Sequence, residues 1–220
     1  MKIHQRHLIA LAACFFLSYF SVLHAEEKPV YYVYLAGPEV FLDKPIEAGE
    51  KKKALIAKLS NKNDWSFVLE GLYPLDNSIP DFKNDFDTGM RIYEANIALM
   101  DKAHFIAANM VRFRGPSMDV GTAYEMGYMA GADKPVFAYY EAKPFYGKME
   151  KPALLTERVK DYWHVDPESP GKDKDGIHIE NFQMIDNLMM VGAYSKTGYP
   201  VAENFEALIM NIADYIQSKK

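Results

Sequence analysis

Runs of β-branched and aromatic residues with few charged side chains constrain the fold of this chain more than any other feature. They predict strands at 30–37, 65–70, 104–110 and 134–140. Because these runs are apolar at consecutive positions, both faces of each strand must be covered, as in a parallel sheet packed between helices. Stretches with helical spacing alternate with them. The sequence therefore predicts an α/β fold with a doubly wound parallel sheet.

Helical spacing of apolar residues predicts the elements that cover this sheet. Helices are expected over 48–59, 88–102, 119–132, 182–190 and 202–217. The last has one apolar stripe, formed by Phe205, Leu208, Ile209, Ile212 and Ile216. Residues 141–180, rich in Lys, Pro, Gly and Asp, are expected to form an elaborated surface segment. Ligands of doubly wound folds bind beyond the C-terminal ends of the strands, so the loops that follow the strands are the places to search for a site.

The composition excludes several classes of protein. With 220 residues, of which 49% are apolar and 25% charged, the chain suits one packed domain and is too apolar for disorder. Its net charge of −5 argues against binding a nucleic-acid polymer. Cys14 is the only cysteine, and His104, His164 and His178 have no short ligand spacing. We therefore expect no metal and no cofactor.

The first 25 residues are expected to be an export signal. Lys2 and Arg6 precede an apolar run that is short for a membrane span, and Ala25 follows it. Cleavage after Ala25 leaves a mature domain of residues 26–220 in the periplasm or outside the cell, with no stable membrane insertion. An alternative stays open, because residues 11–14 resemble a bacterial lipobox that would anchor the chain through Cys14.

Two carboxylates follow the third predicted strand. Asp119 and Glu125 lie on either side of a junction between a loop and a helix. Asp119 suits either a helix cap, which accepts hydrogen bonds from free backbone N–H groups, or a catalytic role. Glu125 suits a cap poorly, because it lies deeper in the helix among Gly121, Thr122 and Gly127. A glutamate on such a face needs a partner or a task, and attack on the anomeric carbon of a sugar is one.

Several ordered motifs between residues 30 and 140, with a short block nearer the C-terminus, resemble one protein family. Taken together, five segments are similar to the nucleoside 2-deoxyribosyltransferases. They are YLAGPEVF, PLDN, ANIALMDKAHFIAAN, FRGPSMDVGTAYEMGYMAGADKPV and DNLM. The block that begins with FRGP is the most specific of them. The resemblance implies a flavodoxin-like α/β fold and a covalent deoxyribosyl-enzyme ester, which a second nucleobase or water resolves. It implies a small-molecule nucleoside and a nucleobase as partners.

This resemblance assigns roles to individual residues. Glu125 matches the family nucleophile. Asp119 matches the carboxylate that orients this nucleophile and the sugar hydroxyls, and Tyr34 matches the tyrosine that contacts the nucleophile. Asp76 and Asn77 of PLDN match positions near the nucleobase.

Three further residues belong to the expected substrate-binding set. Gly37 lets the backbone approach a ligand closely, and Gly121 is one of the small residues near Glu125. Asn187 of DNLM resembles the asparagine that reaches into a neighbouring subunit's site and binds the 5′ end of the sugar. A homo-oligomer, at least a dimer, is the expected consequence.

Asn96 departs from the pattern of many family members, in which an aspartate at this position protonates the leaving base. Asn96 lies one helical turn from Tyr93 and from Met100, so we expect it to face the pocket. An amide hydrogen-bonds a purine nitrogen but does not deliver a proton. Water and Asp76 are the candidates for the proton donor.

Three functions stay open at this point. The first is transfer of 2-deoxyribose between nucleobases. The second is hydrolysis of the N-glycosidic bond of deoxynucleosides or of their 5′-monophosphates. The third is a nucleotide-binding module without catalysis, which the presence of both carboxylates and Tyr34 disfavours.

Two arginines follow the third predicted strand. Arg112 and Arg114 belong either to a solvated loop or to a contact with the base or the 5′-phosphate.

Overall fold

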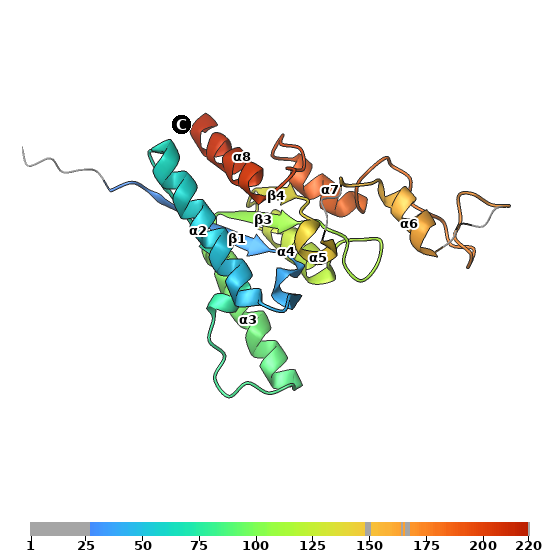
Figure 1. Cartoon of the computed structure of the whole chain (residues 1–220), viewed down its shortest axis with the longest axis horizontal. Helices are drawn as coiled ribbons and strands as arrows, with labels where there is room; N and C mark the ends of the chain where they lie inside the picture. The colour runs from blue at the N-terminus through green and yellow to red at the C-terminus, as the bar shows by residue number, and fades with distance from the viewer. Residues whose placement is uncertain (1–26, 148–150, 164, 166–167, 220) are drawn as a thin grey trace, which may run out of the picture.

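The computed structural model describes residues 27–147, 151–163, 165 and 168–219 (Figure 1). The predicted export signal and its lipobox alternative lie outside these residues. In the described part of the chain, no helix is both long enough and apolar enough to span a membrane.

A sheet of four parallel strands forms the centre of the protein. Its order is β2-β1-β3-β4, built from β1 (Val30–Ala36), β2 (Val68–Leu72), β3 (Phe105–Asn109) and β4 (Val136–Tyr139). Beyond β4, Ala202 forms a parallel bridge with Tyr139, so a single residue pair extends the sheet at this edge. The predicted parallel sheet is confirmed, although β2 begins three residues later than the sequence indicates.

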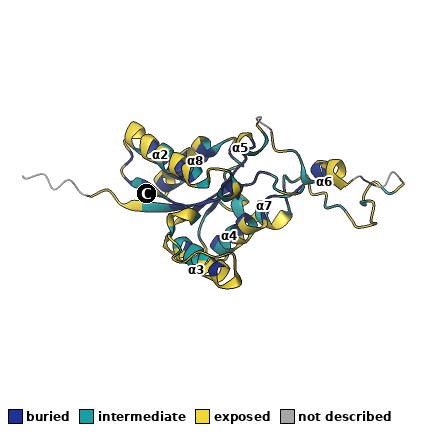
Figure 2. Ribbon diagram, turned by 60° about the horizontal axis from the view of Figure 1, so that its bottom comes forward, coloured by how far each residue is buried: buried dark blue, intermediate teal, exposed yellow. Residues whose placement is uncertain are grey.

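Helices cover both faces of this sheet, as a doubly wound fold requires (Figure 2). One face packs against α2 (Pro45–Asn63) and α8 (Phe205–Ser218), and the other against α3 (Phe86–Lys102), α4 (Val120–Gly131) and α7 (Leu188–Ser195). Successive side chains of a strand point to opposite faces. Leu35 of β1 is therefore buried with α2 and α8, whereas Tyr34 is buried with α3 and α4.

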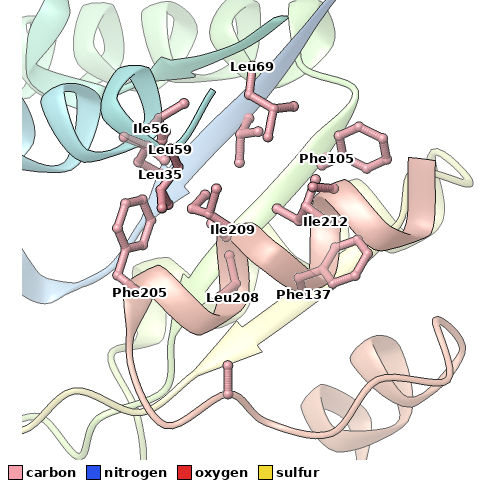
Figure 3. Close-up of a cluster of buried hydrophobic side chains, with 14 of the residues drawn as sticks. Leu35, Ile56, Leu59, Leu69, Phe105, Phe137, Phe205, Leu208, Ile209 and Ile212 are labelled. Carbon is pink, nitrogen blue, oxygen red and sulfur yellow. The ribbon is translucent and has the colours of Figure 1, made fainter. Parts of the chain in front are cut away.

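The core beneath α8 contains the apolar stripe expected from the sequence. Figure 3 shows Phe205, Leu208, Ile209 and Ile212 beside side chains of the strands, and all four are buried. Asn204 begins the helix by accepting a hydrogen bond from the Ala207 amide. Burial of each large apolar side chain contributes roughly 1.5–3 kcal/mol, so this stripe fixes α8 to the sheet.

In the C-terminal third, one prediction was wrong and another was incomplete. The helix expected over 182–190 begins only at Leu188, because Asn187 is its N-cap and accepts a hydrogen bond from the Met189 amide. The segment 141–180 contains α5 (Lys143–Tyr146) and α6 (Leu155–Trp163). The buried residues of α6, Thr156 and Arg158, are polar, so apolar spacing does not reveal this helix.

Candidate functional site

The carboxyl ends of three strands open onto connections that carry most of the predicted site residues. A short 3-10 helix, η1 (Pro38–Phe41), follows β1, and another, η2 (Pro74–Asp76), follows β2. A loop leads from β3 to Asp119, where α4 begins. Ligands of doubly wound folds bind at this edge of the sheet.

Glu125 of α4 and Tyr34 of β1 form the central pair of this edge. The Tyr34 hydroxyl donates a hydrogen bond to Glu125 Oε1 over 2.6 Å. Tyr34 is fully buried and Glu125 is partly buried. The pair forms because β1 and β3 are neighbours and α4 returns over the same face of the sheet.

The environment of Glu125 favours its protonated form. Burial raises the pKa of Glu125 to about 7, and the negative charge of Asp119 adds to this effect. The hydrogen bond from Tyr34 acts in the opposite direction, because it stabilises the carboxylate. The pKa of Tyr34 is raised far above its ordinary value, first by burial and then by Glu125, so its hydroxyl stays a donor. Glu125 therefore titrates near neutral pH beside a fixed donor.

Asp119 is the N-cap of α4. Its Oδ2 accepts hydrogen bonds from the Thr122 amide at 2.8 Å and from the Thr122 hydroxyl at 3.0 Å. The capping role that the sequence suggested is therefore present. Both bonds fall on Oδ2, and no described residue donates to Oδ1. Gly121 lies beside this carboxylate, since a Cβ there would be 3.1 Å from Oδ2.

Asn96 and Asn77 each bury an amide atom that no described residue satisfies. The atoms are Oδ1 of Asn96, on α3, and Nδ2 of Asn77, at the end of η2. These two elements pack against each other. A buried polar atom without a partner costs about 1–3 kcal/mol. A ligand or water is therefore needed to form the missing hydrogen bonds of both amides. One acceptor and one donor are suited to the edge of a heterocyclic base.

Asp76 is held by its neighbours. Its Oδ1 accepts a hydrogen bond from Lys53 Nζ at 2.7 Å, and its Oδ2 accepts one from the Tyr73 amide at 2.9 Å. These two bonds give Asp76 a role in fixing η2. Its role as a proton donor stays a prediction.

Glu39 of η1 is a buried carboxylate that the sequence analysis did not single out. Its Oε1 accepts hydrogen bonds from Asn109 Nδ2 at 2.9 Å and from the Tyr139 hydroxyl at 3.1 Å, and forms an ion pair with Lys52 Nζ at 2.8 Å. Gly37 admits this side chain, because a Cβ at Gly37 would lie 2.0 Å from Glu39 Oε2. Glu39 and Lys52 also line a cavity of about 820 Å³ together with residues of α2 and α8. The only sequence signal for Glu39 was a glutamate within the apolar motif AGPEVF.

The two arginines of the loop after β3 lie on aromatic rings. The Arg114 guanidinium is 4.9 Å from the ring centre of Phe41 and 4.7 Å from that of Phe113, and these two rings stack 5.2 Å apart. The Arg112 guanidinium is 4.2 Å from the ring centre of Tyr146. Such contacts hold a guanidinium in place. Phe41, the last residue of η1, is 54% exposed and adds an apolar surface that was not expected from the sequence.

Asn187 lies apart from these groups in the hydrogen-bond network. Its amide donates to Glu180 Oε2 at 3.0 Å, and its oxygen caps α7. Asp186, the residue before it, is fully buried and accepts hydrogen bonds from the Ser117 hydroxyl and from the Met118 amide. Asp186 therefore fixes the loop that enters α4. The DNLM motif contains Asp186, but the sequence analysis assigned its function to Asn187 alone.

The described residues contain no group of three or more His, Cys, Asp or Glu side chains that could hold a metal ion. The structure brings Tyr34 and Glu125 into contact and places Asp119 at the start of the same helix. The catalytic and binding roles of all these residues stay predictions.

Comparisons with known proteins identify similar sequences and structures. A family model described as nucleoside 2-deoxyribosyltransferase matches residues 33–189. An uncharacterized protein of Schizosaccharomyces pombe is 24% identical over 211 residues, which cover 90% of this chain and 96% of that protein.

Two solved structures share the fold. A 2-desoxiribosyltransferase from Leishmania mexicana has a TM-score of 0.57 and 23% identity, over 84% of this chain and 97% of its own. A conserved protein from Enterococcus faecalis V583 has a TM-score of 0.51 and 18% identity, over 87% of this chain and 99% of its own. At these identities the structural similarity shows the fold alone.

Proposed function

This chain belongs to the nucleoside 2-deoxyribosyltransferase family, and from that premise we propose that it transfers 2-deoxyribose between nucleobases. In this reaction the carboxylate of Glu125 attacks the anomeric carbon of a deoxynucleoside, and the bond to the base breaks. The resulting glycosyl ester is then attacked by a second nucleobase, which releases Glu125. Two inversions give net retention at the anomeric carbon.

The contact between Tyr34 and Glu125 is the observation that carries this proposal. The hydrogen bond occupies Oε1 of Glu125 and orients the carboxylate, which leaves Oε2 as the attacking atom. Burial raises the pKa of Glu125, because the ionised carboxylate loses part of its hydration. A carboxylate with less hydration is a better nucleophile towards an oxocarbenium-like centre. The Tyr34 donor remains in place when Glu125 later leaves the sugar.

The unsatisfied amides of Asn96 and Asn77 support a nucleobase as the leaving group. Their free acceptor and donor would bind the base edge and hold it during cleavage. Because Lys53 and the Tyr73 amide hold Asp76 at η2, we infer that water protonates the departing base. Asp119, whose Oδ1 receives no hydrogen bond from the described residues, would bind a sugar hydroxyl.

We also propose that the enzyme is a homo-oligomer, with Asn187 reaching into a neighbouring site. Apolar side chains at the start of α3 and on the outer face of α4 are more than one-third exposed: Phe86, Met90, Tyr93, Val120 and Tyr124. Contiguous apolar surface of this kind is typical of protein–protein contacts. These residues support a subunit contact close to Glu125.

Incubating the protein with deoxyinosine, with and without adenine, tests the function. Transfer gives deoxyadenosine and hypoxanthine only when adenine is present. Hydrolysis, the second candidate, gives hypoxanthine and free deoxyribose without adenine, and the same assay with deoxyinosine 5′-monophosphate tests the nucleotide form of that reaction. Absence of every product with a correctly folded protein would leave the binding module. A parallel assay with inosine, the ribonucleoside, shows whether the enzyme rejects substrates that carry a 2′-hydroxyl.

For the export signal, we propose cleavage after Ala25 and a mature domain of residues 26–220 in the periplasm or outside the cell. Lys2, Arg6 and the apolar run after them support this proposal. Mass spectrometry of the N-terminus should show a chain that starts near Glu26. A diacylated Cys14 would instead establish a lipoprotein.

A further inference from the structure

Arg158 of α6 is a buried guanidinium with unused hydrogen-bonding capacity. The residue is 8% exposed, and Nη2 donates to Asp186 Oδ2 over 3.1 Å. The other two nitrogens, Nε and Nη1, are buried and have no hydrogen-bond partner among the described residues. A guanidinium does not lose its charge in a protein. Its unpaired donors therefore need an acceptor that the described part of the chain does not supply.

Arg158 lines a cavity of about 430 Å³ behind the loop that follows β3. Arg112 and Lys151 contribute two further cationic side chains to its wall, and Asp161 contributes one carboxylate. The remaining wall is formed by Gly115, Pro116, Tyr140, Ala153 and Tyr162. This volume lies at the small end of the range for ligand pockets, and cations outnumber acids on the described wall.

We propose that this cavity binds the phosphate group of a small molecule, held by Arg158 and Lys151. Phosphate oxygens accept several hydrogen bonds at once, and a guanidinium fixed by a second partner is well placed to donate to them. Asp186 provides that fixing contact, since it holds Nη2 and leaves Nε and Nη1 for the ligand. Inorganic phosphate and a phosphate monoester share this chemistry.

The same carboxylate connects the cavity to the loop that enters α4. Asp186 accepts hydrogen bonds from the Ser117 hydroxyl and the Met118 amide as well as from Arg158. An anion bound to Arg158 therefore lies one side chain away from the loop that ends at Asp119. An anion bound in the cavity should make the contact between α6 and this loop more rigid. Phosphate binding at this cavity can be measured without turnover. Its test is therefore independent of whether Glu125 is a nucleophile.

Calorimetric titration of the full chain tests the site directly. The probes are inorganic phosphate, 2-deoxyribose 5-phosphate and, as a neutral control, 2-deoxyribose, all at constant ionic strength set with chloride. We expect saturable binding of the two phosphates and none of the neutral sugar. Tighter binding of the sugar phosphate identifies a monoester as the ligand, whereas equal affinity shows that the site recognises the phosphate group alone. Binding of inorganic phosphate alone identifies the free ion.

Variants on α6 and the segment before it provide the matched controls. Lys151→Glu should weaken phosphate binding about tenfold or more, because it reverses one charge in the wall. Arg158→Gln should abolish binding, provided that circular dichroism shows an intact fold. Lys160→Glu changes an exposed lysine of the same helix that does not line the cavity, and should leave binding unchanged.

Several outcomes would overturn the proposal. They are phosphate affinities equal to wild type in Lys151→Glu, an equal loss in Lys160→Glu, and absence of phosphate binding to the wild-type chain. If Arg158→Gln does not fold, Lys151→Glu and the neutral Lys151→Gln decide the matter, because Lys151 is exposed and its replacement leaves the pair between Arg158 and Asp186 intact.

Discussion

Two glutamates lie at the carboxyl edge of the sheet, one on each face: Glu39 is buried and Glu125 is partly buried. Glu39, with α2 and α8, receives two hydrogen bonds and an ion pair on one oxygen. Among the described residues, Glu125, on the side of α3 and α4, receives one hydrogen bond, from Tyr34, and forms no ion pair. In this part of the chain the first carboxylate therefore has a cationic partner and the second does not. The number and charge of partners therefore separate a carboxylate that supports the fold from one that is available for chemistry.

The difference has an energetic meaning. Burial pushes a carboxylate towards protonation when no cation compensates its charge, even where a neutral donor such as Tyr34 partly opposes the effect. Burial accordingly raises the pKa of Glu125 to about 7. The cost of keeping such a group in the fold is characteristic of functional sites. Substitutions at the two positions should consequently act on different measured quantities.

Glu125→Ala should give the largest effect, and it should fall on activity. We expect a loss on the order of a thousandfold or more in turnover, because the attacking group is removed. Circular dichroism should show an intact fold, since Glu125 has only one hydrogen-bond partner among the described residues. Steady-state assays with deoxyinosine and adenine provide the measurement. Near-normal turnover in the folded variant would contradict the covalent mechanism.

Glu39→Gln should show the reverse pattern, a loss of stability. It removes the ion-pair partner of the Lys52 ammonium, which is 8% exposed and keeps only the more distant charge of Glu141. Breaking a buried pair costs about 3–5 kcal/mol, and the remaining charge of Glu141 should place the loss at the low end. Urea unfolding at pH 7 measures this loss. The double variant Glu39→Gln with Lys52→Met is the control, because it removes the stranded charge and should recover part of the stability. Wild-type stability in Glu39→Gln would break the distinction between the two glutamates.

The fold was largely predictable from the sequence because its core follows simple periodicities. Consecutive apolar residues revealed the buried strands, and the stripe from Phe205 to Ile216 revealed α8, whose members are buried as expected. α6 was missed because its buried residues are polar. The shift of α7 arose from treating the apolar residues before Asn187 as helical, although Asn187 itself is a strong N-cap signal.

For the site, sequence reasoning reached the residues that lie in motifs and missed those whose partners are distant. Glu125 is recognisable because it stands among small residues of α4, and the match to the family adds Tyr34. Glu39 is not recognisable, because its cation comes from α2 and its other donors from β3 and β4. Asp186 is similar, since Arg158 and Met118 approach it only in the folded chain. Long-range pairing of this kind leaves no local spacing to read.

Asn96 tests whether the unsatisfied amide belongs to the side of the molecule that does chemistry. Asn96→Leu should lose about 2–4 kcal/mol of transition-state binding, because Oδ1 is a buried acceptor without a described partner and is proposed to bind the base. Asn96→Asp should keep or raise activity and shift its pH optimum, since partial burial raises the pKa of a carboxyl group towards a useful range. Values of kcat and KM for purine deoxynucleosides give the measurement. Unchanged kinetics in Asn96→Leu would place this side chain outside the site.

Glu125→Gln should change how stability depends on pH. The pKa of Glu125 is about 7 in the folded chain and 4.5 in the reference state, so the folded protein holds the proton more tightly. Its stabilising contribution is complete below pH 4.5 and is lost as the pH rises through 7. Glu125→Gln lacks this loss and should be more stable than wild type at pH 8, on the order of 2 kcal/mol. Equal stabilities at pH 5 and pH 8 in both proteins would contradict the raised pKa.

Tyr34→Phe should give the smallest effect and the finest test of the comparison, because it removes the single donor that distinguishes Glu125 from an isolated buried carboxylate. That hydrogen bond lowers the pKa of Glu125 against the effect of burial, so its loss raises the pKa further. The acid limb of the profile of kcat/KM against pH should then move upward by about one unit. Activity at pH 8.5 should recover towards wild type, since a larger fraction of Glu125 is ionised there. Tyr199→Phe removes a hydroxyl that donates to Asp214 on α8, on the other face of the sheet, and as a control it should leave the profile in place. A fall in activity that is equal at every pH would show that Tyr34 positions Glu125 without tuning its charge.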